Sequence, residues 1–290
     1  MLNDAIDLHV HAGPELFRRS GDAIDYAEQA KDRGMCGLLL KCHHESTVTR
    51  AYFARRAVPE IEVWGGIVLN SFVGGINPVA VGAAFDLGAR FVWMPTMHAS
   101  HHAGHVGLGT YGIPNMTVSA DATPHKGLTV LDDAGKLTAE ATAVIGLVAK
   151  RGGALGSAHL GPEETRAVVA ECQRVGARCV VTHAFFLGQT MEFLVEMAGL
   201  GAYIEISAAA STAIVRHLMG ESMSLAQARD LIGLVGPEAV VVSSDAGMPE
   251  YPRPVELLES FALSLHAIGV SNEDLRTMMV DVPRRVLGLA

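Results

Sequence analysis

Short apolar runs alternate along this chain with segments in which apolar residues recur at helical spacing. Most of the runs are continuously apolar, as is typical of parallel strands covered on both faces. They predict eight strands, at residues 5–11, 36–42, 62–70, 91–97, 153–159, 179–185, 202–207 and 239–245.

The segments between the strands predict helices with recognisable start and stop signals. Pro162 opens one of them, acidic Glu163 and Glu164 follow it, and Gly176 ends it. These residue types are preferred at those helix positions. The predicted helices cover residues 23–33, 48–57, 78–88, 139–151, 162–175, 189–199, 225–235, 254–268 and 272–280, with a last short turn from Pro283.

A strand followed by a helix, repeated eight times, predicts an α/β fold, a (β/α)8 TIM barrel that occupies residues 1–290 as a single domain. A doubly wound open sheet is the alternative, which the lack of a G-x-G-x-x-G motif after the first strand disfavours. A long insertion, residues 98–136, follows the fourth strand. In a barrel it is expected to lie over the active-site face as a loop or lid.

Six polar side chains fall at the carboxyl ends of the predicted strands, where barrels carry their catalytic groups. They are His9, His11, Lys41, His159, His183 and Asp245. Neutral imidazole is the commonest zinc ligand, so the histidines with Asp245 predict one or two divalent metals, zinc first and manganese second. Such a metal lowers the pKa of bound water to about 7, and Asp245 is placed to carry its proton as the catalytic acid and base.

At these residues the chain resembles the amidohydrolase superfamily of metal-dependent hydrolases. The resemblance rests on His9-x-His11, His159, His183 and Asp245 in that order, and on the ending VDVPRRVLGLA, which looks like the group's Asn-Pro-Ala-x-x-Leu-Gly-Leu tail. It implies that His9, His11 and Asp245 hold one metal, and that His159 and His183 hold a second.

The chain departs from that family at the ligand that bridges two metals. Many members have a carbamylated Lys or a Glu at the end of strand four, and the segment FVWMPTMH has neither. Carbamylated Lys41 is the available substitute. With a single metal instead, His9, His11, His159 and Asp245 would bind it, and His183 would polarise the substrate.

Other polar residues are candidates for substrate binding. They are His44 after strand two, His98, His101 and His102 in the insertion, and Arg253 beyond strand eight. For the insertion histidines the plain alternative is a solvated loop cluster. Glu205 on strand seven needs a partner if it is buried, and His217 and His266 fall in helical segments with an expected structural role.

Composition limits the partners. Lys and Arg number 22 against 31 Asp and Glu, a formal net charge of −9, so we expect neither nucleic-acid binding nor attraction to anionic membranes. A hydrophobic share of 49% with 18% charged residues fits a buried sheet and suggests a homo-oligomer. Acidic Asp4 and Asp7 interrupt the N-terminus where a signal peptide needs an apolar run, and the four cysteines have no disulfide spacing, which together predict a cytoplasmic protein.

The leading functional hypothesis is a metal-dependent hydrolase that cleaves a C–N bond, an amide or cyclic amide, in a small polar molecule. Lactone or phosphoester hydrolysis and metal-assisted decarboxylation would use the same ligands. A different class is a metal-free lyase with Lys41 as Schiff-base nucleophile, because a buried lysine with a lowered pKa suits that chemistry. A binding protein that lost its chemistry is disfavoured by the full ligand set.

Overall fold

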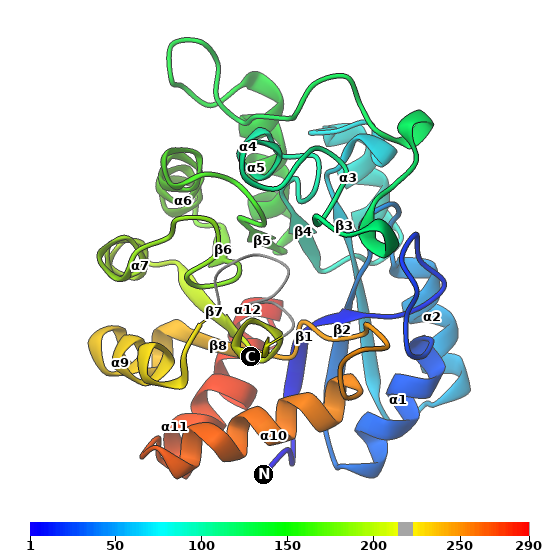
Figure 1. Ribbon diagram of the computed structural model, residues 1–290, viewed down its shortest axis with the longest axis vertical. Coiled ribbons are helices and arrows are strands. Elements are labelled where there is room, and N and C mark those ends of the chain that lie inside the picture. The colour runs from blue at the N-terminus through cyan, green and yellow to red at the C-terminus, as the bar shows by residue number, and fades with distance from the viewer. Residues whose placement is uncertain (214–222, 290) are drawn as a thin grey trace.

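Eight parallel strands form one sheet in sequence order and curve into a barrel with helices around it (Figure 1). The computed structural model describes residues 1–213 and 223–289, so His217 lies outside the described residues. The strands are β1 Ile6–His11, β2 Gly37–Lys41, β3 Glu62–Val68, β4 Phe91–Trp93, β5 Ala154–Gly156, β6 Arg178–Val181, β7 Tyr203–Ser207 and β8 Val240–Ser243. The (β/α)8 prediction is confirmed.

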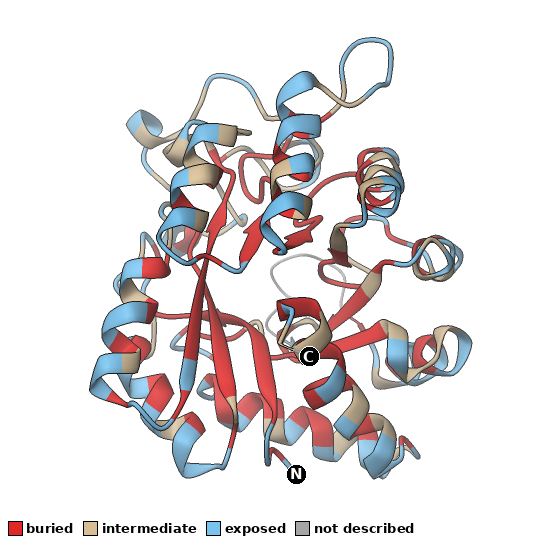
Figure 2. Cartoon of the chain, turned by 180° about the vertical axis from the view of Figure 1, so that it is seen from behind, coloured by how far each residue is buried: buried red, intermediate tan, exposed pale blue. Residues whose placement is uncertain are grey.

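The helices cover the outside of the barrel, with their buried residues against the strands and their exposed residues outward (Figure 2). They are α1 Ala23–Asp32, α2 Val48–Ala57, α3 Pro78–Asp86, α5 Ala139–Arg151, α6 Pro162–Val175, α7 Met191–Gly199, α9 Leu225–Val235, α10 Pro254–Ala267, α11 Asn272–Arg276 and α12 Val282–Leu287. A turn of π-helix, Thr277–Asp281, joins the last two. Within the described residues, none of the helices is long and apolar enough to cross a membrane.

Several strands end earlier than the apolar runs predict. β5, β6 and β8 stop two to four residues before the predicted ends at 159, 185 and 245. The backbone turns into the left-handed region there, with φ of 52° at Ala158, 58° at His183 and 51° at Asp245. This conformation is uncommon for residues other than glycine and clusters at functional sites, so the polar ends of these strands are loops bent by the surrounding structure.

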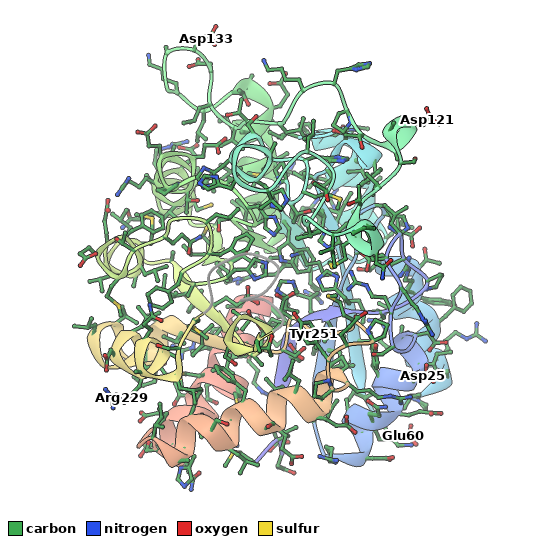
Figure 3. All side chains as sticks on the ribbon, viewed as in Figure 1. Asp25, Glu60, Asp121, Asp133, Arg229 and Tyr251 are labelled. Atoms are coloured by element: carbon green, nitrogen blue, oxygen red, sulfur yellow. The ribbon has the colours of Figure 1, made fainter. Side chains whose placement is uncertain are left out.

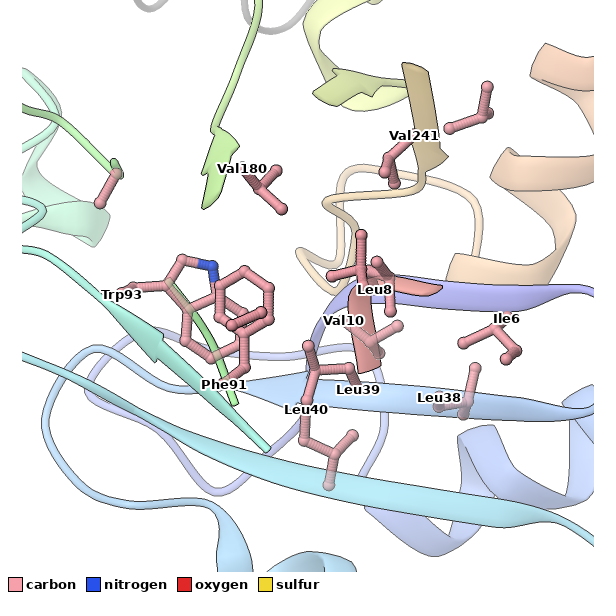
Figure 4. Packing of buried hydrophobic residues seen from close by; sticks show 14 of the residues in the cluster. Ile6, Leu8, Val10, Leu38, Leu39, Leu40, Phe91, Trp93, Val180 and Val241 are labelled. Atoms are coloured by element: carbon pink, nitrogen blue, oxygen red, sulfur yellow. The ribbon is translucent and has the colours of Figure 1, made fainter. Parts of the chain in front are cut away.

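Two aromatic side chains of β4 pack beside aliphatic side chains of other strands in the core (Figure 4). The rings of Phe91 and Trp93 pack with their centroids 4.4 Å apart. The neighbouring strands leave room for the indole through Gly66 and Gly156, where an added Cβ would lie 2.6 Å and 2.7 Å from Trp93 atoms. Lys41 Nζ lies 5.7 Å from the centre of the Trp93 ring, so this packed layer is the floor of the cavity above.

The barrel is closed between β1 and the residues that follow β8. The amide of Asp245 donates to the carbonyl of His9 over 2.9 Å, and the amide of His11 donates to the carbonyl of Ala246 over 2.9 Å. The amide of Ser244 donates to the buried Asp7 carboxylate over 3.0 Å. The first and last strands are therefore joined at the residues proposed from the sequence as metal ligands.

The 98–136 insertion has two parts. Its first part contains a helix that the sequence did not predict, α4 Ser100–His105, and runs inward to the buried Met116. Its second part is mostly exposed, with Asp121 and Asp133 at the edge of the molecule (Figure 3). The far end is fixed by Glu164 of α6, which accepts from Thr129 Oγ1 over 2.7 Å and from the amide of Val130 over 3.0 Å.

Candidate active site

Three histidines converge on the carboxylate of Asp245. Its Oδ1 lies 3.0 Å from His9 Nε2 and 3.4 Å from His11 Nε2, and its Oδ2 lies 3.5 Å from His183 Nδ1. His9 and His11 share one face of β1 because alternate residues of a strand point the same way. Asp245 and His183 reach the same point from the bends after β8 and β6.

A second carboxylate, Glu205 of β7, supports this group from within the barrel. Its Oε1 lies 2.9 Å from His9 Nδ1 and accepts from the Ser243 hydroxyl over 2.6 Å. Its Oε2 accepts from the backbone amide of His183 over 3.3 Å. The sequence raised Glu205 as a buried carboxylate in need of a partner, and the structure gives it three.

Burial keeps the site histidines neutral, so their ring nitrogens keep lone pairs for a cation. It lowers the pKa of His9, His11 and His183 well below the usual 6.5, and nearby cationic groups lower it further. Burial raises the pKa of Asp245 to about 7, although the nearby Lys41 acts in the opposite direction.

Lys41 closes the same group from the end of β2. Its Nζ lies 3.0 Å from His9 Nε2, and its side chain is buried. Burial lowers its pKa below the usual 10.5, while the carboxylates of Asp245 and Glu205 oppose that effect. The amine therefore gives up its proton more readily than an exposed lysine.

His159 reaches the cavity from the loop after β5 and touches the insertion. Its Nδ1 lies 3.0 Å from Nδ1 of His102 in α4, and the two rings stack with centroids 4.9 Å apart. Its ring centre lies 5.4 Å from that of His183. His159 is therefore beside the His9, His11 and Asp245 group, with His183 between them.

An ion pair lies behind His11, in the loop after β1. Arg19 contacts the Glu15 carboxylate through its Nε, and its Nη2 lies 3.2 Å from His11 Nδ1. Burial alone raises the pKa of Glu15, but Arg19 and His43 lower it to about 2. The opposite charges at positions 15 and 19, four residues apart in the loop after a strand that ends in His-x-His, are the sequence signal for this pair.

These residues surround a cavity of about 90 Å³ at the carboxyl ends of the strands. Its polar wall has Tyr111 and Tyr251 beside the histidines, and its apolar wall has Met116, Phe186 and Met248. The full lining is His11, Arg19, Lys41, His43, Tyr111, Met116, His159, His183, Phe186, Ser207, Ala210, Asp245, Met248 and Tyr251. Tyr111 lies in the insertion, and its hydroxyl is 3.4 Å from His43 Nε2.

The five residues expected to contact substrate are not part of this lining. His44 is half-buried and lies 3.1 Å from Cys42 Sγ, and Arg253 is exposed at the start of α10. His98 is buried and accepts from the amide of Ser71 over 3.1 Å. His101 Nε2 lies 2.9 Å from the carbonyl of Leu187, and His102 lies behind His159. His98 and His102 are thus buried, unlike members of a solvated loop cluster.

Donor sets that suit a metal ion occur twice around His9. The ligand atoms of His9, His11 and Asp245 lie within 4.8 Å of one another, and so do those of His9, His183 and Glu205. Neutral imidazoles with carboxylates are the donors that zinc and similar ions prefer. The residues of the site therefore fit one divalent ion, with donors for a second nearby.

Comparison with solved structures finds proteins with the same fold at low sequence identity. An amidohydrolase from Pseudomonas aeruginosa matches with a TM-score of 0.62 at 14% identity, over 99% of this chain and 97% of that one. A putative 2-pyrone-4,6-dicarboxylic acid hydrolase from Pseudomonas putida matches with a TM-score of 0.61 at 19% identity, over 99% and 98%. The organophosphorus hydrolase from Deinococcus radiodurans matches with a TM-score of 0.59 at 11% identity, over 98% and 92%.

These matches, all below 20% identity, show that the chain shares its fold with these three hydrolases. No curated protein matches the sequence. A family model matches residues 4–205, which run from before β1 into β7 and include all the strand-end histidines but not Asp245. Because that match covers more than half of the chain, the protein belongs to the family of unknown function DUF6282.

Proposed function

We propose that this protein is a metal-dependent hydrolase of a small polar substrate, with cleavage of a C–N bond as its leading reaction. The observation that carries the proposal is the meeting of His9, His11 and His183 within 3.5 Å of the Asp245 carboxylate, at the mouth of the barrel. Convergence of buried neutral imidazoles on one carboxylate is costly without a cation to share.

The first metal position is assigned to His9, His11 and Asp245, and His159 and His183 are available for a second. Glu205 supports that second position by its contacts with His9 and with the amide of His183. A divalent metal, with zinc preferred over manganese, would lower the pKa of bound water to about 7 and polarise a carbonyl group.

Asp245 is assigned the proton transfers. Its raised pKa of about 7 lets it hold or release a proton near neutral pH. In amide hydrolysis the water oxygen bonds to the carbonyl carbon and the C–N bond breaks. Asp245 takes the proton that the water loses and delivers it to the leaving nitrogen, so the products are an acid and an amine.

Lys41 is assigned the bridging ligand as a carbamate. A neutral amine adds to CO₂ and loses one proton to become an anionic carboxylate-like group. The lowered pKa of Lys41 and its 3.0 Å distance from His9 Nε2 support this assignment. We expect the Lys41→Ala variant to lose turnover and to regain it when short carboxylic acids are added. An unchanged rate and an unchanged metal content in this variant would refute the carbamate assignment.

Substrate contacts fall to the side chains that face the cavity, namely Tyr111, Tyr251, Arg19 and His43. The cavity of about 90 Å³ supports a small substrate. Lactone and phosphoester hydrolysis and metal-assisted decarboxylation remain alternatives on the same ligands, and a screen of amides, lactones and phosphoesters separates them. Cytoplasmic location and self-association stay predictions.

The buried Lys41 favours a second candidate, a metal-free lyase that forms a Schiff base. Its lowered pKa and its place in the cavity wall suit a nucleophilic amine. Borohydride trapping with carbonyl compounds distinguishes the two, since only the lyase leaves a reduced adduct on Lys41.

Metal analysis of the purified protein tests the main proposal. We expect at least one zinc or manganese ion per chain, and its loss in the double variant His9→Ala/His11→Ala. The matched control is His105→Ala/His266→Ala, which removes two exposed histidines. The proposal would be refuted if the unaltered protein held less than one metal ion per chain and if added zinc or manganese did not raise that content.

A further inference from the structure

His102 of the insertion makes two polar contacts that together determine where its hydrogen lies. Its Nε2 is 2.8 Å from the backbone carbonyl of Thr110, and its Nδ1 is 3.0 Å from Nδ1 of His159. The side chain is fully buried within the described part of the chain. A carbonyl oxygen only accepts hydrogen bonds, so Nε2 of His102 carries the hydrogen.

The hydrogen between the two rings then belongs to His159. Both rings are buried, and burial disfavours the charged, doubly protonated form of imidazole, so each ring carries one hydrogen. His102 uses its hydrogen for Thr110 and offers a lone pair at Nδ1. His159 must therefore donate from Nδ1, which leaves its Nε2 without hydrogen on a ring that lines the cavity.

Glu205 does the same for His9. A carboxylate oxygen of Glu205 lies 2.9 Å from His9 Nδ1, which leaves His9 Nε2 for a ligand. A carboxylate or carbonyl that holds the second nitrogen of a metal-binding histidine is a common device. For His159, the insertion supplies the corresponding group through a neutral histidine.

We propose that His102 is a positioning residue that fixes the Nδ1–H tautomer of His159, and that the insertion thereby forms part of the metal-binding site. The role in metal binding rests on the proposed function, whereas the tautomer is a property of the metal-free chain. The sequence-based role of His102 in substrate contact is replaced by this one.

The direct test is a long-range ¹H–¹⁵N correlation spectrum of the metal-free protein with ¹⁵N-labelled histidine at pH 7. The signals of His159 are assigned by their loss in His159→Gln. We expect a protonated Nδ1 and an unprotonated Nε2 for His159. A hydrogen on Nε2 of His159 in the unaltered protein would overturn the proposal, whatever the metal content.

Two variants separate positioning from packing. His102→Phe keeps a ring against His159 but removes the acceptor, so we expect the hydrogen of His159 to move to Nε2 and Zn²⁺ affinity to fall about 10- to 100-fold. His102→Asn retains an acceptor oxygen near Nδ1 and should preserve both properties. His105→Phe, on the exposed side of α4, is the matched control and should change neither.

Three outcomes are distinguishable. Weaker Zn²⁺ binding in His102→Phe without a change of tautomer would assign His102 to packing and overturn the proposal. If His159 has the expected tautomer but neither the unaltered protein nor any variant binds Zn²⁺, the proposed metal-dependent hydrolase function is refuted and the positioning contact still stands. If His102→Phe does not fold, the tautomer of the unaltered protein and of His102→Asn still decides the matter.

Discussion

Glu205 connects three parts of the site through one carboxylate. It accepts from Ser243 of β8, contacts His9 of β1 and accepts from the amide of His183 after β6. Each of these groups is buried, so loss of the acceptor would leave a donor without a partner. A single residue in the middle of β7 thus connects two proposed ligands, His9 and His183, with Ser243 of β8.

The substitution Glu205→Gln tests this connection. The amide places a donor where the carboxylate accepts, so His9 should lose its fixed orientation. We expect Zn²⁺ affinity about 10- to 100-fold lower, measured by competition with a chelator. Glu163→Gln, an exposed residue at the start of α6, serves as control. Equal affinity for both variants would show that Glu205 does not orient the ligands.

His98 gives a prediction about pH. Its Nδ1 accepts a hydrogen bond from the amide of Ser71. Burial lowers its pKa to about 4, so this side chain binds a proton at higher pH in the unfolded chain than in the folded chain. The free energy of unfolding should therefore fall as the pH drops from about 6.5 toward 4, by at most about 1.4 kcal/mol per pH unit from this residue.

The variant His98→Asn isolates that contribution, since its side-chain oxygen still accepts the Ser71 amide but does not titrate. Urea unfolding at several pH values should show a shallower loss of stability for this variant than for the unaltered protein. His105→Asn, at an exposed histidine, should keep the original slope. Parallel slopes for all three would contradict the assignment.

Among the secondary-structure elements, the start of α6 holds the end of the 98–136 insertion in place through hydrogen bonds. Glu164 accepts from Thr129 and Val130 with one oxygen and from the amide of Gly161 with the other. Glu163, its neighbour, is exposed. The sequence predicts both as acidic residues of a helix start, and only the fold distinguishes an anchor from a solvated charge.

Replacing each in turn tests the anchor. Glu164→Ala leaves three donors without their acceptor and should lower the free energy of unfolding by about 2–4 kcal/mol. It should also speed limited proteolysis within residues 98–136. Glu163→Ala should change stability by less than about 0.5 kcal/mol. Similar effects of the two substitutions on stability and proteolysis would argue against the anchor.

Element existence was more predictable than element ends. All eight strands and the nine longest predicted helices are present, because burial on a barrel leaves a periodic pattern of apolar residues. The ends of β3, β4, β5, β6 and β8 were overestimated by two to four residues, because apolar or small residues continue after the hydrogen-bonded ladder stops. Left-handed backbone at Ala158, His183 and Asp245 follows β5, β6 and β8, and composition does not reveal it.

In the molecule as a whole, the residues that close the barrel are also residues of the candidate site. The bonds that join β1 to the segment after β8 involve His9, His11 and Asp245. Gly247 lies at this seam with a φ of 145°, and a Cβ added there would lie 1.9 Å from the carbonyl oxygen of His11. No side chain fits in that space without moving β1.

Gly247→Ala should therefore open the seam. We expect a loss of more than about 3 kcal/mol in the free energy of unfolding, together with weaker Zn²⁺ binding. The matched control is Gly146→Ala in α5, where an added Cβ would meet nothing within 4 Å apart from the adjoining backbone, and it should stabilise the protein by about 0.5–1 kcal/mol. Urea unfolding measures both, and a neutral effect of Gly247→Ala would refute the closure argument.

The barrel, its helices and the gathering of His9, His11, His159, His183 and Asp245 at one end of it follow from the amino-acid sequence alone, because they depend on local periodicity and on the geometry common to parallel barrels. Only the tertiary structure decided the partners of those residues. His102 meets His159 across 57 positions, and Glu205 meets His9 across 196. Such contacts depend on how the sheet closes and on the path of an insertion that has no periodic pattern. The spacing of residues along the chain predicts neither of these.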